Sequence, residues 1–108
     1  MALLDQQTRY VYLLRAEFND PEREADWNRW YDEKHVPELL SVPGFVSCTR
    51  YQERGAPGRY LAAYEIEGAD VFAEPRYRAV TGWGEWEPYI AEWRRAVYEV
   101  VEEIPART

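Results

Sequence analysis

The chain has 108 residues, of which 46% are hydrophobic and 31% charged, so its length predicts a single domain with one core. Its 20 acidic and 13 basic residues give a net charge of −7, which argues against nucleic acid or an anionic membrane as a partner, because both bind basic surfaces. One cysteine excludes an intrachain disulfide, and one histidine excludes a metal site built from several histidines of one chain.

The first half of the chain alternates between strand and helix patterns. Residues 9–18 are rich in Tyr, Val and Leu and predict a strand, and the turn at 19–21 then starts a helix over 22–40. Pro37 lacks a backbone donor, so we expect it to break or kink that helix just after Val36. A second strand follows over 45–51.

The second half predicts a third strand over 60–66 and a last strand over 98–104, with its neighbours 93–97. Between them, proline and glycine interrupt a helical region over 70–91. The order β-α-β-β-α-β predicts an α+β, ferredoxin-like fold, in which a four-stranded antiparallel sheet carries its helices on one face. We expect one domain over 1–108, with a core over about 9–104.

The predicted strands are apolar on both faces. In the first strand, Tyr10, Tyr12 and Leu14 point one way, while Val11 and Leu13 point the other. Two helices cover only one face of a sheet, so another chain must cover the second face. The sequence therefore predicts a homodimer in which two sheets pack face to face.

No apolar run reaches the length of a transmembrane helix, and the first residues lack the pattern of a signal peptide, so a cytoplasmic protein is expected. The chain also has no glycine-rich phosphate loop and no recognisable metal-ligand spacing, so no cofactor and no metal are expected.

The densest functional signal lies in the first helix. Trp27, Tyr31 and His35 are four residues apart, which places an indole, a phenol and an imidazole on one stripe of a helix. Histidine is the natural proton-transfer side chain near neutral pH, so His35 is a candidate general acid/base. The alternative is that His35 only packs or caps the end of the helix.

Other polar residues in apolar segments have two interpretations each. Arg15 and Arg50 could hold a carboxylate or phenolate in a cavity, although an ion pair with one of the many acids is the favoured interpretation. Asp32 could orient a ring nitrogen of His35 or lie on a solvated face. Cys48 is expected to be a small core residue.

Two motifs add a resemblance to a known family. A His-x-Pro and a Pro-Gly-Phe motif within 27–45 resemble the end of the first helix and the following turn of the EthD-like group of dimeric α/β-barrel proteins, and the stretches 82–89 and 94–98 are similar to its second helix and last strand. The motif residues are His35, Pro37, Pro43, Gly44 and Phe45.

The resemblance implies a dimer with a central β-barrel and a pocket in each subunit between sheet and helices. Relatives in the wider superfamily carry out cofactor-independent cyclisation, isomerisation, decarboxylation or oxygenation of small aromatic or polyketide-like molecules. In several of them a pocket histidine and a tyrosine move the proton. The matching histidine is His35, and geometry gives Tyr31, Tyr12 or Tyr64 as its partner.

The resulting prediction is a cofactor-independent lyase, isomerase or cyclase, in which His35 transfers the proton and Tyr31 polarises an oxygen. A non-catalytic dimeric protein that binds a small molecule or assists another enzyme is the alternative, and a cofactor-free monooxygenase is the third. The expected substrate-binding residues are Tyr12, Trp27, Arg50, Tyr64, Trp83 and Trp86.

Overall fold

Residues 9–107 are described in this computed structural model; residues 1–8 and 108 of the predicted domain, including most of the segment tested for a signal peptide, lie outside the described residues. The strands are β1 (Tyr10–Phe18), β2 (Phe45–Gln52), β3 (Arg59–Ile66) and β4 (Ile90–Glu99). The α-helices are α1 (Glu24–Trp30), α2 (Val36–Leu40) and α3 (Pro75–Val80).

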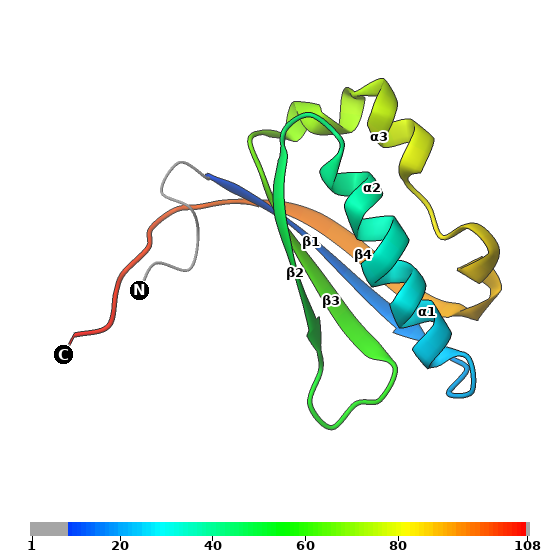
Figure 1. The fold of residues 1–108 in the computed structure, drawn as a ribbon. Coiled ribbons are helices and arrows are strands. Elements are labelled where there is room, and N and C mark those ends of the chain that lie inside the picture. Colours follow the sequence, from blue (N-terminus) through cyan, green and yellow to red (C-terminus); the bar gives the residue numbers. More distant parts are fainter. Residues whose placement is uncertain (1–8, 108) are drawn as a thin grey trace.

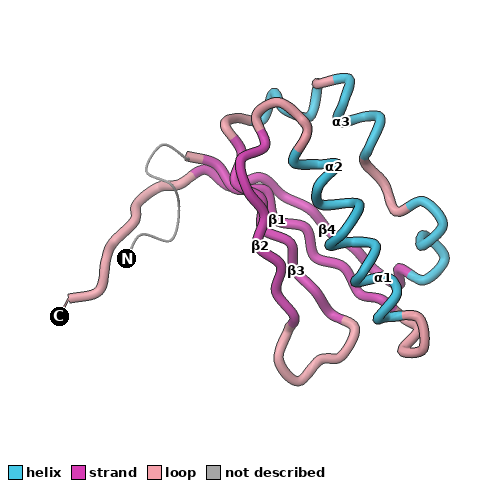
Figure 2. The backbone as a smooth tube through the Cα atoms, viewed as in Figure 1, coloured by secondary structure: helices cyan, strands magenta, loops and turns pink. Residues whose placement is uncertain are grey.

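The four strands form one antiparallel sheet in the order β2-β3-β1-β4. All three α-helices lie on one face of this sheet, and the other face carries none (Figure 1; Figure 2). The predicted ferredoxin-like α+β fold is therefore confirmed. None of the helices in residues 9–107 has the length and apolar character needed to cross a membrane.

The helix that carries the candidate site does not break at Pro37. A π-helical segment (Tyr31–His35) joins α1 to α2, and the Val36 N–H donates to the Tyr31 carbonyl five residues back. A proline ring clashes with the carbonyl four residues before it in an α-helix, and a wider turn relieves that clash. Of the expected break or kink, the break is absent, because the helix widens before Pro37 and continues to Leu40.

The last strand begins earlier than expected. β4 spans Ile90–Glu99 and pairs with β1 along its whole length, from Phe18↔Ile90 to Tyr10↔Glu99. Pairing with β1 therefore fixes its limits, and residues 100–107 extend beyond the sheet. The predicted interruption of the second helical region is confirmed, since α3 lies between two 3-10 segments, Ala69–Ala73 and Gly84–Tyr89.

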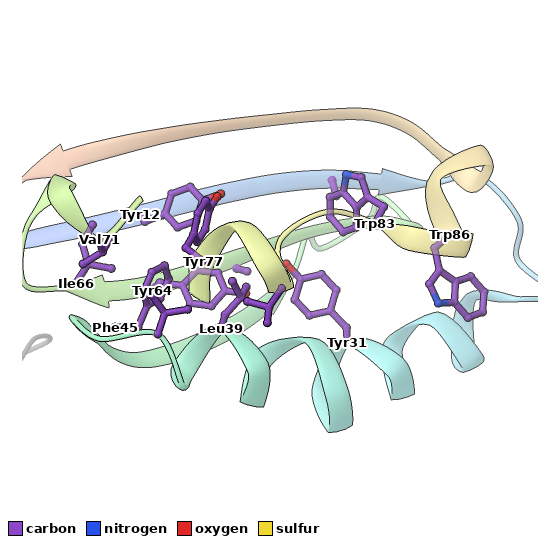
Figure 3. Close-up of a cluster of buried hydrophobic side chains, with 14 of the residues drawn as sticks. Tyr12, Tyr31, Leu39, Phe45, Tyr64, Ile66, Val71, Tyr77, Trp83 and Trp86 are labelled. Carbon is purple, nitrogen blue, oxygen red and sulfur yellow. The ribbon is translucent and has the colours of Figure 1, made fainter. Parts of the chain in front are cut away.

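The core lies between the helices and the covered face of the sheet, and rings dominate it (Figure 3). One aromatic cluster surrounds Tyr12, which stacks on Tyr64 at 5.5 Å and meets Phe72 edge-on at 4.9 Å between ring centroids. A second cluster surrounds Trp27, which is fully buried and stacks on Phe18 at 4.8 Å.

The face without helices carries a group of apolar side chains around Leu13. Leu13 lies opposite Ala63 on β3 and Ala96 on β4, and Val11 lies opposite Tyr98. Strand alternation turns these side chains away from the helices, and Tyr98 is 51% exposed. This surface is the one that the predicted homodimer would cover.

Candidate functional site

The stripe of Trp27, Tyr31 and His35 forms as the spacing predicts. Their relative exposures are 0%, 2% and 5%, so the whole stripe faces the sheet. Tyr31 meets both neighbours edge-to-face, with ring centroids 5.5 Å from Trp27 and 5.1 Å from His35. Aromatic pairs prefer this geometry.

His35 lies in an aromatic sandwich at the end of the π-helical segment. Its ring stacks on Trp30 at 4.7 Å and lies 6.2 Å from Trp83. Burial, followed by the positive charge of Arg50, lowers the pKa of His35 to about 4. The imidazole is therefore neutral at pH 7.

Arg50 enters the same region from β2. Its side chain is only 15% exposed and donates to Asp32 Oδ1 at 2.7 Å and to Asn28 Oδ1 at 2.9 Å. The guanidinium carbon lies 4.0 Å from the centroid of the Tyr31 ring. The ion pair favoured for Arg50 is thus present, and Asp32 binds this arginine rather than the ring nitrogen of His35.

Asn28 continues these contacts toward the surface. Its amide nitrogen donates to the Tyr60 hydroxyl at 3.0 Å, and Tyr60 donates in turn to Glu24. A polar chain therefore runs from Asp32 through Arg50 and Asn28 to the carboxylate of Glu24. The sequence analysis missed Asn28 and Tyr60, although Asn28 and Asp32 are four residues apart and share one helix face.

Several buried polar atoms at this site have no hydrogen-bond partner among residues 9–107: Trp27 Nε1, Tyr31 Oη, Arg50 Nε and Tyr64 Oη. Burial raises the pKa of Tyr31 to about 12, against the opposing effects of the Tyr64 hydroxyl and Arg50. Burial also raises the pKa of Tyr64. Both phenols are therefore protonated at neutral pH and can donate a hydrogen bond. Leaving such groups unpaired costs about 1–3 kcal/mol each.

A narrow hollow separates α1 from the sheet at this point. Trp27, Tyr31 and Arg50 line it together with Tyr60, and it has no space for a water molecule in this conformation. His35 lines neither this hollow nor the larger groove on the open face of the sheet. The site is thus closed, with its charged and hydroxyl groups already converging.

The other predicted site residues lie at different depths. Trp83 is close to both Trp27, at 6.2 Å, and Tyr31, at 6.0 Å, between ring centroids. Figure 3 shows the Tyr31 side chain rising from its helix toward the sheet and Trp83. Trp86 packs near Trp30 at 6.4 Å, whereas Tyr12 belongs to the separate cluster with Phe72.

Cys48 points to the same covered face of the sheet. Burial raises the pKa of its thiol to about 11, so it is protonated at pH 7. A protonated thiol is a weak nucleophile, which agrees with the expected role of a small packing residue. Within residues 9–107, no group of three or more His, Cys, Asp or Glu side chains could hold a metal ion.

Comparison with solved structures places the fold. A variant of SnoaB, a cofactor-independent oxygenase from Streptomyces nogalater, superposes with a TM-score of 0.71 at 16% identity over 92% of this chain and 99% of that chain. A Deinococcus radiodurans protein named for antibiotic biosynthesis monooxygenase gives 0.70 at 12% identity, with 92% and 99% coverage. The chain has the ferredoxin-like fold of these oxygenases.

A third neighbour carries a ligand. The monooxygenase ActVA-Orf6 of Streptomyces coelicolor, in complex with nanaomycin D, superposes with a TM-score of 0.65 at 13% identity over 95% of this chain and 96% of that chain. No protein-family model and no curated protein sequence matches the chain.

These neighbours correct two expectations. The lyase, isomerase or cyclase activity is wrong as the main interpretation, because the named neighbours are monooxygenases and oxygenases. The resemblance lies with the antibiotic biosynthesis monooxygenase fold, and the narrower EthD-like assignment is not shown.

Proposed function

We propose that the protein is a cofactor-independent monooxygenase for an electron-rich, polyketide-like phenol, bound between the sheet and α1. The observation that carries this proposal is the pairing of Arg50 with Tyr31. A permanently charged guanidinium stacks on the phenol ring, and each of the two side chains has one buried, unpaired donor. Two such donors in an apolar site fit an anionic oxygen. The names of the structural neighbours support the reaction class.

The charge of Arg50 is suited to the first step of such a reaction. A nearby cation lowers the pKa of a bound phenol and favours the phenolate, whose ring carbon is rich enough in electrons to react with dioxygen. In the overall reaction, the ring carbon loses its hydrogen and gains one oxygen atom as a carbonyl, the phenol oxygen becomes the second quinone carbonyl, and the other oxygen atom leaves as water. The substrate supplies all four electrons, so no external reductant is needed.

The site also contains side chains that could donate or accept protons during the reaction. Tyr31 and Tyr64 are protonated at pH 7 and donate to the anionic oxygen or to the peroxide that forms. His35 remains a proposed proton acceptor, because its imidazole is neutral at pH 7. For that role, bound substrate must displace the aromatic side chains that separate His35 from the hollow.

Binding requires the closed site to open. Trp27 and Trp83 then become the aromatic walls, and burial of a flat ligand between them excludes water. Trp86 and Tyr12 are proposed as outer contacts of the same pocket. We also propose that the protein works as a homodimer, in which a second sheet covers the apolar face around Leu13.

Oxygen uptake tests the reaction class. We expect purified protein to consume dioxygen in the presence of one or more dihydroxynaphthalenes, with a quinone found by mass spectrometry. Arg50→Gln should lower the rate by about 100-fold or more, whereas Arg29→Gln, exposed on the outside of α1, should leave it unchanged. Recovery of bound but unaltered ligand, with no oxygen consumed, would instead indicate a binding protein.

A further inference from the structure

Two side chains of α1 meet the start of β3 at one tyrosine hydroxyl. Glu24 and Asn28 are four residues apart and share a helix face, and Tyr60 is the second residue of β3. The Tyr60 hydroxyl donates to Glu24 Oε2 at 2.5 Å and accepts from Asn28 Nδ2 at 3.0 Å. A separation of about 2.5–2.7 Å is typical of a strong hydrogen bond from a hydroxyl to a carboxylate.

Tyr60 also forms part of the wall of the closed hollow. It lines the hollow together with Trp27, Tyr31 and Arg50. The centroid of its ring lies 5.3 Å from the Arg50 guanidinium carbon and 5.3 Å from the centroid of the Trp27 ring. Glu24 does not line the hollow, and it is partly exposed to solvent. Tyr60 therefore lies between the hollow and a carboxylate that water can reach.

Asn28 fixes the direction of the Tyr60 hydroxyl. The Asn28 amide group donates to the Glu24 backbone carbonyl at 3.1 Å and to Tyr60, while its oxygen accepts from Arg50. Because Asn28 donates to the Tyr60 oxygen, the hydroxyl hydrogen points to Glu24. A hydroxyl oxygen accepts up to two hydrogen bonds, so one position is left for a hydroxyl group bound in the hollow.

The proposed oxygenation requires such an acceptor, since the substrate phenol must lose its hydroxyl proton to become a phenolate. Tyr31 is protonated, and Arg50 is permanently charged, so neither can take this proton. His35 does not line the hollow. The other lining residues are Leu14, Ala16, Trp27, Leu61 and Ala62, whose side chains are not bases. Tyr60 is thus the lining residue that leads to a base.

We propose that Tyr60 is a catalytic residue that passes the phenol proton of the substrate to Glu24. This inference rests on the monooxygenase function proposed above and adds a proton path to it. The substrate O–H bond breaks as its proton moves to the Tyr60 oxygen, and Tyr60 gives its own proton to Glu24 Oε2, from which water takes it. The phenolate remains beside Arg50. Two protons are taken up again when the second oxygen atom leaves as water, so the overall reaction is unchanged.

Oxygen uptake by Tyr60→Phe tests the first transfer. The variant keeps the ring and its packing but loses the hydroxyl, so we expect kcat to fall about 100-fold or more while KM changes less than about threefold. Tyr51→Phe is the matched control, because Tyr51 is 53% exposed and its rate should be unchanged. An unaltered kcat in Tyr60→Phe would overturn the relay and leave the oxygenase intact. Absence of oxygen uptake by the unaltered protein would overturn both.

Glu24→Gln separates proton transfer from a structural role. Glutamine can still accept the hydrogen bond from Tyr60, but it cannot take the proton, so kcat should fall about tenfold or more. Glu33→Gln, exposed on the same helix, should keep the full rate. A structural role alone would leave Glu24→Gln nearly as fast as the unaltered protein, and that result would contradict the proposal.

Addition of acetate to Glu24→Ala provides a readout that packing does not affect. The shortened side chain leaves room for a free carboxylate at a partly exposed position, so the rate should rise in proportion to the acetate concentration. The same acetate should not accelerate Tyr60→Phe, in which the hydroxyl that feeds the carboxylate is missing. Equal acceleration of Tyr60→Phe by acetate would contradict a path through Tyr60.

Discussion

Arg50 is the side chain on which the proposed chemistry depends. It is charged at every physiological pH, nearly buried, and held by Asn28 and Asp32 at fixed distances. An arginine held in this way is preorganised to bind an anionic oxygen, because it needs little rearrangement when charge develops. Asn28 is therefore a positioning residue, and Arg50 the group that would touch the substrate.

Binding of 4-nitrophenol tests this role without a known substrate. We predict that the pKa of bound 4-nitrophenol is about one unit lower than its pKa in water. The absorbance band of the phenolate should therefore appear at a correspondingly lower pH. Arg50→Gln should abolish the shift, and Arg29→Gln should retain it. An unshifted pKa of 4-nitrophenol bound to the unaltered protein would contradict the assigned role of Arg50.

His35 makes a second prediction, which concerns stability. Its pKa falls from 6.5 in the unfolded chain to about 4 in the folded one. Between these values the unfolded chain binds the extra proton, so the free energy of unfolding decreases as the pH falls through this window. The loss attributable to His35 should be about 2–3 kcal/mol at pH 4.5 relative to pH 7.5.

Urea unfolding at pH 7.5 and 4.5 measures this effect. Because carboxyl groups also titrate in this range, the informative quantity is the difference between the protein and its His35→Gln variant. The variant should lose less stability on acidification, by the amount stated above. Identical losses in both proteins would show that His35 is not desolvated in the folded state.

At the scale of elements, the turn between α2 and β2 sets where the candidate site meets the sheet. Gly44 has a φ of 95°, and a Cβ there would lie 2.3 Å from Val71 Cγ1. Only glycine fits both the backbone conformation and the close approach. The turn thereby fixes the position of the first helix, and with it the aromatic stripe, over the sheet.

Gly44→Ala should therefore lower the free energy of unfolding by about 2 kcal/mol or more, since strain and overlap add. Gly55→Ala is the matched control, because Gly55 has a φ of 78° with no atom within 4 Å of the added Cβ. Gly55→Ala should lower the free energy of unfolding by only about 1 kcal/mol. Equal losses in urea unfolding would show that the contact with Val71 does not constrain the turn.

The elements also show how far a sequence can be interpreted. Trp27, Tyr31 and His35 share a face because helical spacing is a local property, and it survives the widening of the helix. The π-helical segment was not foreseen, since Pro37 predicts a clash but not how the backbone relieves it. The limits of β4 were misplaced because they depend on pairing with β1, a contact between segments far apart in sequence.

In the candidate site, too, local spacing could be predicted from the sequence, and contacts between distant segments could not. Helical spacing could bring Trp27 and Tyr31 together, but it could not show that Arg50 from β2 lies over the Tyr31 ring. Nor could it show that His35 is sandwiched by Trp30, which displaces it from the hollow. Each of these facts depends on the register in which the helix packs on the sheet.

At the scale of the whole molecule, the fold is shared with proteins of very low sequence identity. Alternation of apolar residues and the order of elements determine such a fold, and these persist when the individual residues change. The reaction is a property of the site, so the same fold led first to an incorrect expectation of lyase or isomerase activity. The proposal of a dimeric oxygenase therefore rests on the aromatic core, the buried arginine and the uncovered sheet face, and not on the fold.

The most direct test follows the two atoms of dioxygen. A dihydroxynaphthalene that supports oxygen uptake is incubated with the protein under ¹⁸O-labelled dioxygen, and the quinone and the water are analysed by mass spectrometry. The proposed monooxygenase places one labelled atom in the new carbonyl and the other in water, and Arg50→Gln slows both in parallel. A new carbonyl without label, or its formation at the same rate in Arg50→Gln, would contradict the proposed function.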